Sequence, residues 1–292
     1  MSLFLLIRYY FKNPKFTLLS FKGNLYCCLI CKILGIKVIL RSNASITGWS
    51  KGFLRHFFYK NISKMADKII VNSLEFKDEY KKKFKIKTHC IYNPLNKDEI
   101  IKNSKKKIVF SFFKRNTNNF ISIGRLVDQK DQITLLKAVN RIKNQIDFDL
   151  IIVGDGNKKK ELLDFIKTNN LSKRVRLIGS KHDPIKLIKL SDIFILTSLY
   201  EGLPNVLLEA QVLKTYIISS NCSTGPKEIL LNGKAGSLFK IRDYKGLSKL
   251  ILNFSKNKRK NLRVIKYGYK HLFRFNYKSN LNKYSEEINS LI

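Results

Sequence analysis

Two basic side chains follow a glycine near the middle of the chain, where Gly124 precedes Arg125 and Lys130. The apolar run before the glycine predicts a strand, and the residues after the lysine predict a helix. An arginine and a lysine at this spacing can aim two cations at one point, which suits a diphosphate. Basic residues near a helix start are usually solvated, so this pattern alone is weak evidence.

A second group of polar residues lies in the segment 198–210, which reads Ser-Leu-Tyr-Glu-Gly-Leu-Pro-Asn-Val-Leu-Leu-Glu-Ala. Gly202 and Pro204 predict a tight turn into a helix, whose free N–H groups and dipole favour an anion. Glu201 in the loop and Glu209 on the helix can accept hydrogen bonds from sugar or ribose hydroxyls. Taken singly, each glutamate is an ordinary surface residue, but the flanking pattern indicates a binding site.

Two further loops combine glycine with small residues. Val153-Gly-Asp-Gly156 allows close backbone approach to a ligand, but it is neither a Walker A loop nor a full G-x-G-x-x-G motif, because residue 159 is lysine. Residues 220–228 place small residues and a proline before another helix, where Glu228 is either a site residue or a carboxylate stabilised by the helix dipole.

The elements that must position these residues alternate between strand and helix. Short apolar runs separated by amphipathic segments predict a parallel sheet covered on both faces, hence a doubly wound α/β domain. Ligands of such sheets bind beyond the carboxyl ends of the strands. We expect strands at 120–123, 148–153, 175–178, 193–197, 215–219 and 236–239, with helices at 131–145, 158–169, 184–190, 204–213 and 226–231.

The first part of the chain repeats this alternation on a smaller scale. We expect strands at 16–20, 36–41, 68–72 and 87–92, and helices at 24–34, 53–65 and 74–84. The polar segment 101–119 favours a domain boundary. We therefore expect an N-terminal domain at 1–104, a C-terminal domain at 105–275, and a helix at 276–292 that packs back on the N-terminal domain.

The motifs, in this order, resemble those of the glycosyltransferases of the large retaining family 4, which have the GT-B fold with two Rossmann-like domains. The resemblance covers roughly residues 85–245, and its E-x7-E segment in the G-L-P-N-V context is highly specific. The matching segments are G-R-L-x-x-x-K at 124–130, V-G-D-G at 153–156, L-I-G at 177–179, S-D-I-F-I-L-T-S at 191–198, E-G-L-P-N-V-L-L-E-A at 201–210 and G-P-K-E at 225–228.

The resemblance implies a transferase that moves a sugar from a nucleotide diphosphate sugar, by our expectation a UDP-sugar, with retention at the anomeric carbon. Arg125 and Lys130 would hold the diphosphate, Glu209 the ribose and Glu201 the donor sugar. Arg125, Lys130 and Glu201 form the expected catalytic set. No metal or other cofactor is expected, since the basic pair would stabilise the leaving diphosphate. The remaining expected donor-binding residues are Gly124, Gly154, Gly179, Ser180, Gly202, Leu203, Pro204 and Asn205.

The sequence departs from the family pattern at its start. Members of the family begin with a glycine-rich loop after the first strand, and this chain shows no such opening. The resemblance therefore implies that 105–275 is the nucleotide-sugar-binding domain and that 1–104 is a partial or unusually small acceptor-side domain, in which Asn43 to Trp49 would occupy the acceptor cleft. An inactive remnant that binds nucleotide or a partner is the alternative to an active enzyme.

The acceptor is indicated by residues 53–60, Phe-Leu-Arg-His-Phe-Phe-Tyr-Lys. This basic and aromatic segment suits a membrane surface and therefore a lipid-linked acceptor, with a glycan as the broader class. The alternative is that the aromatic side chains belong to the core, and we favour it for most of them.

The charge balance is strongly basic, with 57 Lys and Arg against 21 Asp and Glu, a net charge of +36. Such a field attracts polyanions and anionic lipid, so a nonspecific nucleic-acid-binding protein is a further alternative. The lysines are scattered, and no basic-aromatic motif of a known nucleic-acid module is present, which favours compositional bias. The apolar segment 25–40 is interrupted by Lys32, Gly35 and Lys37, so we expect a cytoplasmic protein, at most peripheral on the inner face of the cytoplasmic membrane.

Five cysteines, an odd number in a long chain, argue against a disulfide framework. Cys28 and Cys31 form a C-x-x-C pair with no second pair or histidine cluster to complete a metal site. We expect both thiols to lie in the core.

Overall fold

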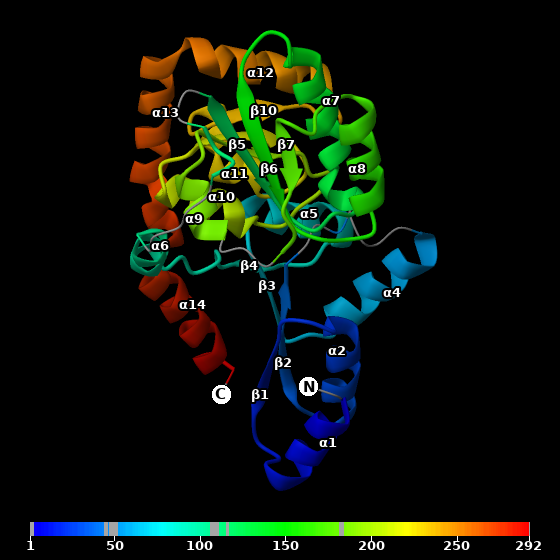
Figure 1. The fold of residues 1–292 in the computed structure, drawn as a ribbon. Helices are drawn as coiled ribbons and strands as arrows, with labels where there is room; N and C mark the ends of the chain where they lie inside the picture. Colours follow the sequence, from blue (N-terminus) through cyan, green and yellow to red (C-terminus); the bar gives the residue numbers. More distant parts are fainter. Residues whose placement is uncertain are drawn as a thin grey trace. The chain divides into compact units, whose positions relative to one another are not determined.

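The structure is a computed structural model that describes residues 3–43, 46, 52–105, 111–114, 117–180 and 184–291. The chain forms two compact units, one comprising Met1–Pro94 with Phe275–Ile292 and the other Leu95–Arg274 (Figure 1). Each unit is built on its own parallel sheet. The domain boundaries expected from sequence stay a prediction.

The sheet of unit Leu95–Arg274 has six strands in the order β10-β9-β8-β5-β6-β7, all parallel. The first strand of this unit, β5, lies inside the sheet. Strands β6 and β7 follow on one side of it, and β8, β9 and β10 follow on the other. This is the Rossmann order, in which the strand sequence reverses between β5 and β8. The strands are β5 (Asn118–Ile123), β6 (Phe148–Val153), β7 (Val175–Leu177), β8 (Ile193–Leu196), β9 (Tyr216–Ser220) and β10 (Ser237–Phe239).

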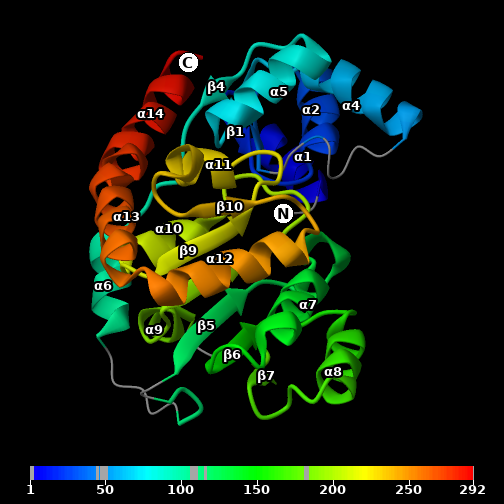
Figure 2. The same ribbon diagram turned by 90° about the horizontal axis from the view of Figure 1, so that it is seen from above.

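Helices cover this sheet on both faces. The helices α7 and α12 lie side by side over it (Figures 1 and 2), and their apolar side chains join those of α8 in one core. Alternate strand residues such as Ile121, Ile151 and Phe194 face the other way and are fully buried too. The helices are α6 (Lys97–Ser104), α7 (Gln132–Ile142), α8 (Lys159–Thr168), α9 (Pro184–Lys189), α10 (Asn205–Val212), α11 (Pro226–Ile229), α12 (Tyr244–Lys256) and α13 (Lys258–Lys270).

Local sequence explains why these elements form. All six residues of β6 are buried, as the continuous apolar run of a central parallel strand requires. On α7, Leu135, Leu136 and Val139 are buried whereas Lys137 is exposed, which gives the helix one apolar face. The short 3-10 turn Asp128–Lys130 delivers the chain into α7.

The sheet of the other unit has four parallel strands in the order β1-β2-β3-β4. Its strands are β1 (Thr17–Ser20), β2 (Lys37–Ser42), β3 (Lys68–Val71) and β4 (His89–Cys90). Its helices are α1 (Leu3–Lys12), α2 (Asn24–Ile33), α4 (Phe53–Lys64), α5 (Leu74–Phe84) and α14 (Tyr277–Asn289).

The two faces of this smaller sheet are covered by different parts of the chain. One face packs against side chains of α1, α2, α4 and α5. The other face carries Ile39, Ile70 and Ile91, which pack against Tyr284 and its neighbours on α14. Polar contacts fix this helix, because the Lys68 ammonium lies 2.6 Å from the Glu287 carboxylate. The last helix of the chain thus completes the core of the first unit.

Most elements expected from periodicity are confirmed. The last strand of the first part is shorter than expected, because only His89 and Cys90 pair with β3. Helices α1, α6, α12 and α13 were not predicted. Cys28 and Cys31 are fully buried and free, as expected, and burial raises the pKa of Cys31 to about 12.

Two expectations about the first unit have a different outcome. The core interpretation of the aromatic segment is wrong for most of its residues: Phe53, Phe57 and Phe58 on α4 are 84%, 52% and 56% exposed, and only Tyr59 is buried. The expected acceptor-cleft segment Asn43 to Trp49 lies outside the described residues except for Asn43 and Ile46. Among the helices of the described ranges, none has the length and apolar character needed to span a membrane.

Candidate functional site

The point where the strand order reverses brings two loops of the larger unit together. Strands β5 and β8 are neighbours, with Phe120 paired to Ile193 and Ile121 to Phe194. Because parallel strands end at the same edge of the sheet, the loop after β5 and the loop after β8 both begin there. These loops carry the basic residues and the first glutamate singled out from the sequence.

Lys130 and Glu201 meet at this edge. The Lys130 Nζ lies 2.5 Å from Glu201 Oε1, and both side chains are largely buried, with 17% and 9% exposed. The hydroxyl of Ser198 donates to the same carboxylate oxygen at 2.6 Å. The aliphatic part of Lys130 passes over Gly124, where a Cβ would stand 3.3 Å from its Cδ and Cε atoms. The glycine therefore leaves room for the lysine side chain.

Backbone-directed hydrogen bonds hold the two loops in register. Gln129 donates from Nε2 to the Tyr200 carbonyl at 2.9 Å, and the Leu199 N–H donates to the Gln129 carbonyl at 2.8 Å. The Thr197 hydroxyl donates to the Lys130 carbonyl at 2.8 Å. The lysine and the glutamate are thus positioned by the backbone as well as by their own contact.

Arg125 differs from Lys130 in its surroundings. Its side chain is exposed and makes one long hydrogen bond, 3.4 Å from Nη2 to Gln129 Oε1. Its carbonyl accepts from Gln132 Nε2 at 3.0 Å, which fixes the backbone but leaves the guanidinium at the surface. The structure therefore brings Lys130 and Glu201 into direct contact, while the Arg125 guanidinium lies at the surface of the same loop.

The glycines of the Val153-Gly-Asp-Gly156 loop pack against the loop after β5. A Cβ on Gly154 would stand 2.0 Å from the Gly124 carbonyl oxygen, and one on Gly156 would stand 2.3 Å from that of Leu126. Both glycines have positive φ, 147° and 157°. The Gly154 N–H donates to the Gly179 carbonyl at 2.9 Å, so the loop after β7 lies at the same edge of the sheet. Ser180, which follows, is exposed.

The turn into α10 is packed against the loop after β9. A Cβ on Gly225 would stand 2.0 Å from the Gly202 carbonyl oxygen and 2.8 Å from Pro204 Cδ. The Thr224 hydroxyl donates to the Glu201 carbonyl at 2.5 Å. Gly202, Leu203 and Pro204 are buried, whereas Asn205, the first residue of α10, is exposed.

Glu209 is half-buried on α10. Burial raises the pKa of its carboxyl from the ordinary value of 4.5. No side chain among the described residues donates a hydrogen bond to this carboxylate. A half-buried carboxylate in this state gains from hydroxyl donors that a ligand supplies.

Two site residues were not singled out from sequence. Ser198 holds the Glu201 carboxylate, and its place at the end of the S-D-I-F-I-L-T-S motif was the available signal. Cys222 is buried close to this group, and burial, with a contribution from the Glu201 charge, raises the pKa of its thiol to about 12. Throughout the described ranges, no three His, Cys, Asp or Glu side chains are grouped so as to hold a metal ion.

Comparison with known proteins places this geometry in a family context. The profile described as Glycosyl transferases group 1 matches residues 103–271. An uncharacterized glycosyltransferase of Methanocaldococcus jannaschii is 37% identical over 178 residues, which cover 59% of this chain and 44% of the relative. A Campylobacter jejuni protein named N-acetylgalactosamine-N,N'-diacetylbacillosaminyl-diphospho-undecaprenol 4-alpha-N-acetylgalactosaminyltransferase is 28% identical over 228 residues, covering 74% of this chain and 60% of the relative.

The chain therefore spans about half the length of these curated relatives, 44% and 60%. Among solved structures, Anabaena HepE in complex with UDP has a TM-score of 0.81 at 18% identity, covering 98% of this chain and 81% of HepE. This likeness shows the fold, which is GT-B with a parallel sheet in each of two Rossmann-like units. Because the family profile matches more than half of the chain, the protein belongs to the glycosyl transferases group 1.

Proposed function

We propose that the protein transfers a sugar from a UDP-sugar to a lipid-linked or glycan acceptor in polysaccharide or glycoconjugate synthesis, with retention at the anomeric carbon. The observation that carries the proposal is the contact of Lys130 with Glu201 at the reversal point of a Rossmann sheet. A cation and a carboxylate held together at that edge offer one group for a diphosphate and one for sugar hydroxyls.

The proposed chemistry uses these residues directly. Arg125 and Lys130 bind the diphosphate, so that the lysine exchanges part of its contact with Glu201 for a phosphate oxygen. Glu201 then accepts hydrogen bonds from the donor sugar. The bond between the anomeric carbon and the phosphate oxygen breaks, and a bond to the acceptor oxygen forms on the same face. The acceptor proton passes to the leaving phosphate, whose charge the two cations stabilise without a metal or other cofactor.

The remaining donor contacts follow the same edge. Glu209 accepts hydrogen bonds from the two ribose hydroxyls, which would satisfy its half-buried carboxylate. Gly179 and Ser180 lie beside the nucleobase. Backbone N–H groups of the turn into α10 contribute to phosphate binding. The other members of this proposed contact set are Gly124, Gly154, Gly202, Leu203, Pro204 and Asn205.

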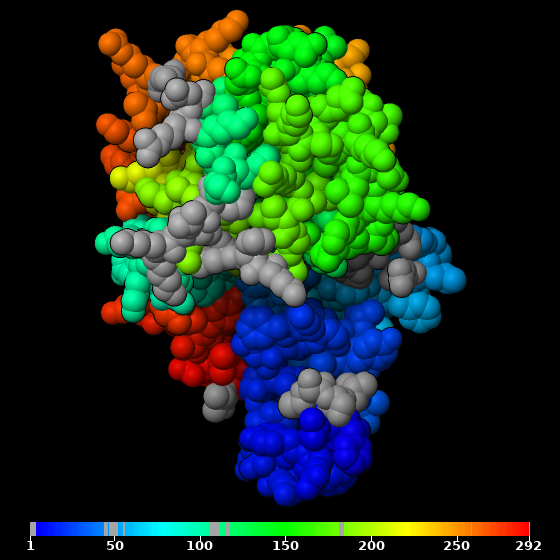
Figure 3. Space-filling view, viewed as in Figure 1, coloured from blue at the N-terminus to red at the C-terminus, as the bar shows by residue number. Residues whose placement is uncertain are grey.

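A membrane-bound acceptor is supported by the exposed side chains of the smaller unit. Helix α4 exposes Phe53, Leu54 and Phe57, and α1 exposes Phe4 and Phe11 by 71% and 78%. The side chains of α1, dark blue, form part of the surface in Figure 3. Apolar side chains next to lysines and arginines suit the surface of an anionic bilayer, so we place the protein peripherally on the inner face of the cytoplasmic membrane. The Campylobacter relative, whose name includes diphospho-undecaprenol, also favours a lipid-linked acceptor.

Calorimetric titration with UDP, GDP, ADP and CMP at moderate salt tests the donor site. We expect selective binding of UDP that is lost in Glu209→Ala and in Lys130→Ala. Asp164→Ala serves as the control for Glu209→Ala, because Asp164 is an exposed carboxylate on α8 and its loss changes the net charge equally. Equal binding of all four nucleotides, unaffected by the variants and abolished by salt, would reject the site and leave only the +36 charge to explain it.

A turnover assay tests the reaction itself. The purified chain is mixed with UDP-sugars and a polyprenyl-diphosphate-linked sugar, and the anomeric configuration of the product is determined by NMR. An α-linked product from an α-linked donor supports retention. An inverted product contradicts it, and binding of UDP without any turnover favours the inactive alternative.

A further inference from the structure

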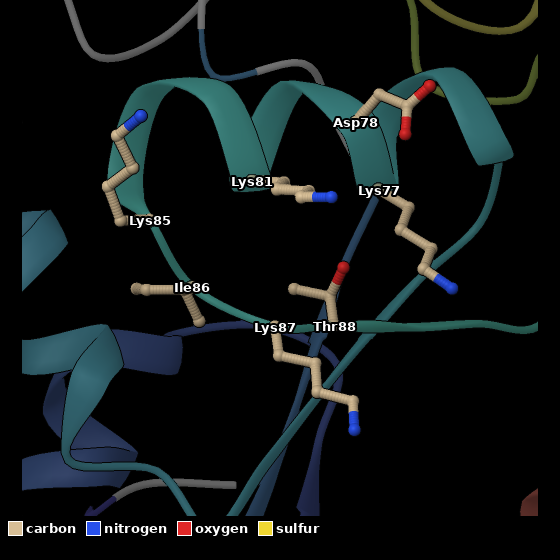
Figure 4. Close-up of a pocket in the computed structure, with 7 residues that line it drawn as sticks. All are labelled: Lys77, Asp78, Lys81, Lys85, Ile86, Lys87 and Thr88. Carbon is tan, nitrogen blue, oxygen red and sulfur yellow. The ribbon is translucent and has the colours of Figure 1, made fainter.

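A basic pocket lies in the smaller unit, between helix α5 and the chain that enters β4 (Figure 4). Its volume is about 610 Å³. This pocket, here called the α5 pocket, is lined by residues of the smaller unit, whereas the candidate donor site belongs to the unit Leu95–Arg274. Its lining residues are Lys77, Asp78, Lys81, Lys85, Ile86, Lys87 and Thr88.

The charges of the α5 pocket are unbalanced. Four lysines and one aspartate line it, so the net charge of the lining is 4 − 1 = +3. The ion pair on this helix, Lys83 with Glu79, involves neither the lining lysines nor Asp78. In Figure 4 the Asp78 carboxylate points away from the space between helix and strand, whereas Lys81 lies on the side of the helix that faces this space and Lys77 extends beside it. Lys85 and Lys87 extend away from the space, so Lys77 and Lys81 are the cations that the lining presents to it.

A buried hydroxyl lies at the base of this space. Thr88 is only 3% exposed, and its Oγ1 has no hydrogen-bond partner among the described residues. The hydroxyl points from the strand toward the helix, with Lys81 opposite (Figure 4). A buried hydroxyl is normally hydrogen-bonded, so an unpaired one that faces a pocket is an independent sign of a ligand.

Stabilisation of the C-terminal end of α5 does not account for all the lysines that line the α5 pocket. Lysines in the last turn offset the partial negative charge of the terminal carbonyls, which explains Lys81. Lys77 lies one turn earlier, and Lys87 follows the helix. Neither this effect nor composition explains why Thr88 turns an unpaired hydroxyl toward the same space.

We propose that the α5 pocket binds a phosphoryl-bearing anion, with the lysine ammonium groups contacting its oxygens and the Thr88 hydroxyl donating to one of them. Charge-assisted hydrogen bonds of this kind are the strong ones, and Lys is a common phosphate ligand. A diphosphate matches the lining charge of +3 better than a single phosphate. The proposal does not depend on the proposed donor site.

Lysine acylation followed by mass spectrometry tests the pocket at residue resolution. The full chain is labelled with and without inorganic pyrophosphate, at moderate salt and with UDP present to occupy the donor site. We expect pyrophosphate to protect Lys77 and Lys81. The exposed lysines of α12 are the internal control, and their labelling should not change; they are Lys245, Lys249 and Lys256.

Calorimetric titration of variants with pyrophosphate measures how much the lysines contribute to affinity. The double variant Lys77→Gln, Lys81→Gln should weaken pyrophosphate binding about tenfold or more, because charge-assisted contacts are lost. The α12 double variant Lys245→Gln, Lys249→Gln removes the same charge and should leave the binding unchanged. Thr88→Val keeps the side-chain shape and should weaken binding without loss of thermal stability, since the hydroxyl has no internal partner to lose.

A second labelling experiment distinguishes a soluble phosphoryl compound from a lipid headgroup. Phosphatidylcholine vesicles with and without phosphatidic acid replace pyrophosphate in the labelling experiment. Protection by free pyrophosphate identifies a soluble anion, whereas protection by phosphatidic acid vesicles alone identifies a lipid headgroup. No protection by either probe overturns the proposal, as does equal loss of binding in the α5 and α12 double variants. Loss of UDP binding with protection intact counts against the donor site only.

Discussion

Lys130 and Glu201 are 71 positions apart in sequence, yet the ammonium of one contacts the carboxylate of the other at 2.5 Å. Each reaches the contact from the carboxyl end of a neighbouring strand, and the Ser198 hydroxyl shares the same carboxylate oxygen. The pair is largely buried, so each charge depends on the other for much of its solvation. The contact therefore affects the stability of the folded protein, and this effect can be measured apart from the effect on turnover.

A double-mutant cycle on this pair should show strong coupling. Lys130→Met leaves a buried carboxylate that still accepts from the Ser198 hydroxyl but has lost its counter-charge, and Glu201→Gln leaves a buried ammonium without its counter-charge. We expect each single variant to lose about 2 kcal/mol in free energy of unfolding, and the double variant to lose less than the sum. Chemical denaturation measures this, and additive losses would contradict the coupling. Turnover should fall in all three variants.

Glu209 should make the ligand-free protein less stable at neutral pH. Its pKa is raised by burial, so the folded state holds the proton more tightly than the unfolded chain. At low pH the Glu209 carboxyl is protonated in both states and does not destabilise the fold. The free energy of unfolding then falls as the pH rises from the pKa of Glu209 in the unfolded chain through its higher pKa in the folded protein. Glu209→Gln should raise the melting temperature at pH 7, with the gain vanishing below pH 4.5.

The same variant should respond less to nucleotide. At a given free UDP concentration c the native state is stabilised by RT ln(1 + c/Kd), so the wild type, which should bind UDP more tightly, should gain more melting temperature than Glu209→Gln. Differential scanning fluorimetry with and without UDP gives both numbers. A variant that is less stable in both conditions would mean that Glu209 is a structural residue instead.

Gly154 should tolerate no side chain. Its φ of 147° is strained for other residues, and a Cβ would meet the Gly124 carbonyl oxygen at 2.0 Å. We expect Gly154→Ala to lose about 3 kcal/mol or more and to lose nucleotide binding as the two loops separate. Gly233→Ala is the matched control in the same unit, because it has positive φ but open space, and it should lose only about 1 kcal/mol.

Helix α4 should contribute to membrane binding. Replacing the exposed Phe53 and Phe57 by serine should weaken binding to anionic vesicles, measured by sedimentation, at least about tenfold. Burying one Phe side chain is worth about 1.5–3 kcal/mol, and about 1.4 kcal/mol corresponds to a tenfold change in affinity. The control replaces Phe273 and Leu262, which are also exposed but lie in the larger unit. Equal effects of both double variants would point to general adhesion driven by charge and apolar surface.

Periodicity was sufficient for the sheet of the larger unit, because its strands are short apolar runs buried on both faces. It was insufficient for α4, where aromatic residues that typify a core lie at the surface, since composition does not tell which face of a helix meets a partner. The contacts of Lys130 with Glu201 and of Gly154 with Gly124 depend on strand order, which no local pattern encodes. The roles assigned to the donor-site residues stay predictions until binding is measured.

Helix α14 has a consequence for how the chain matures on the ribosome. The face of the smaller sheet that carries Ile39 and Ile70 is covered by residues of the segment Phe275–Ile292, which follows the whole of the other unit in sequence. The unit Leu95–Arg274 is continuous in sequence and can fold as soon as it has emerged. The sheet of the smaller unit must therefore wait, with one apolar face uncovered, until Phe275–Ile292 have been synthesised. During that interval the nascent chain is a natural client for chaperones, and termination before Phe275 would leave the smaller unit incomplete but the larger unit intact.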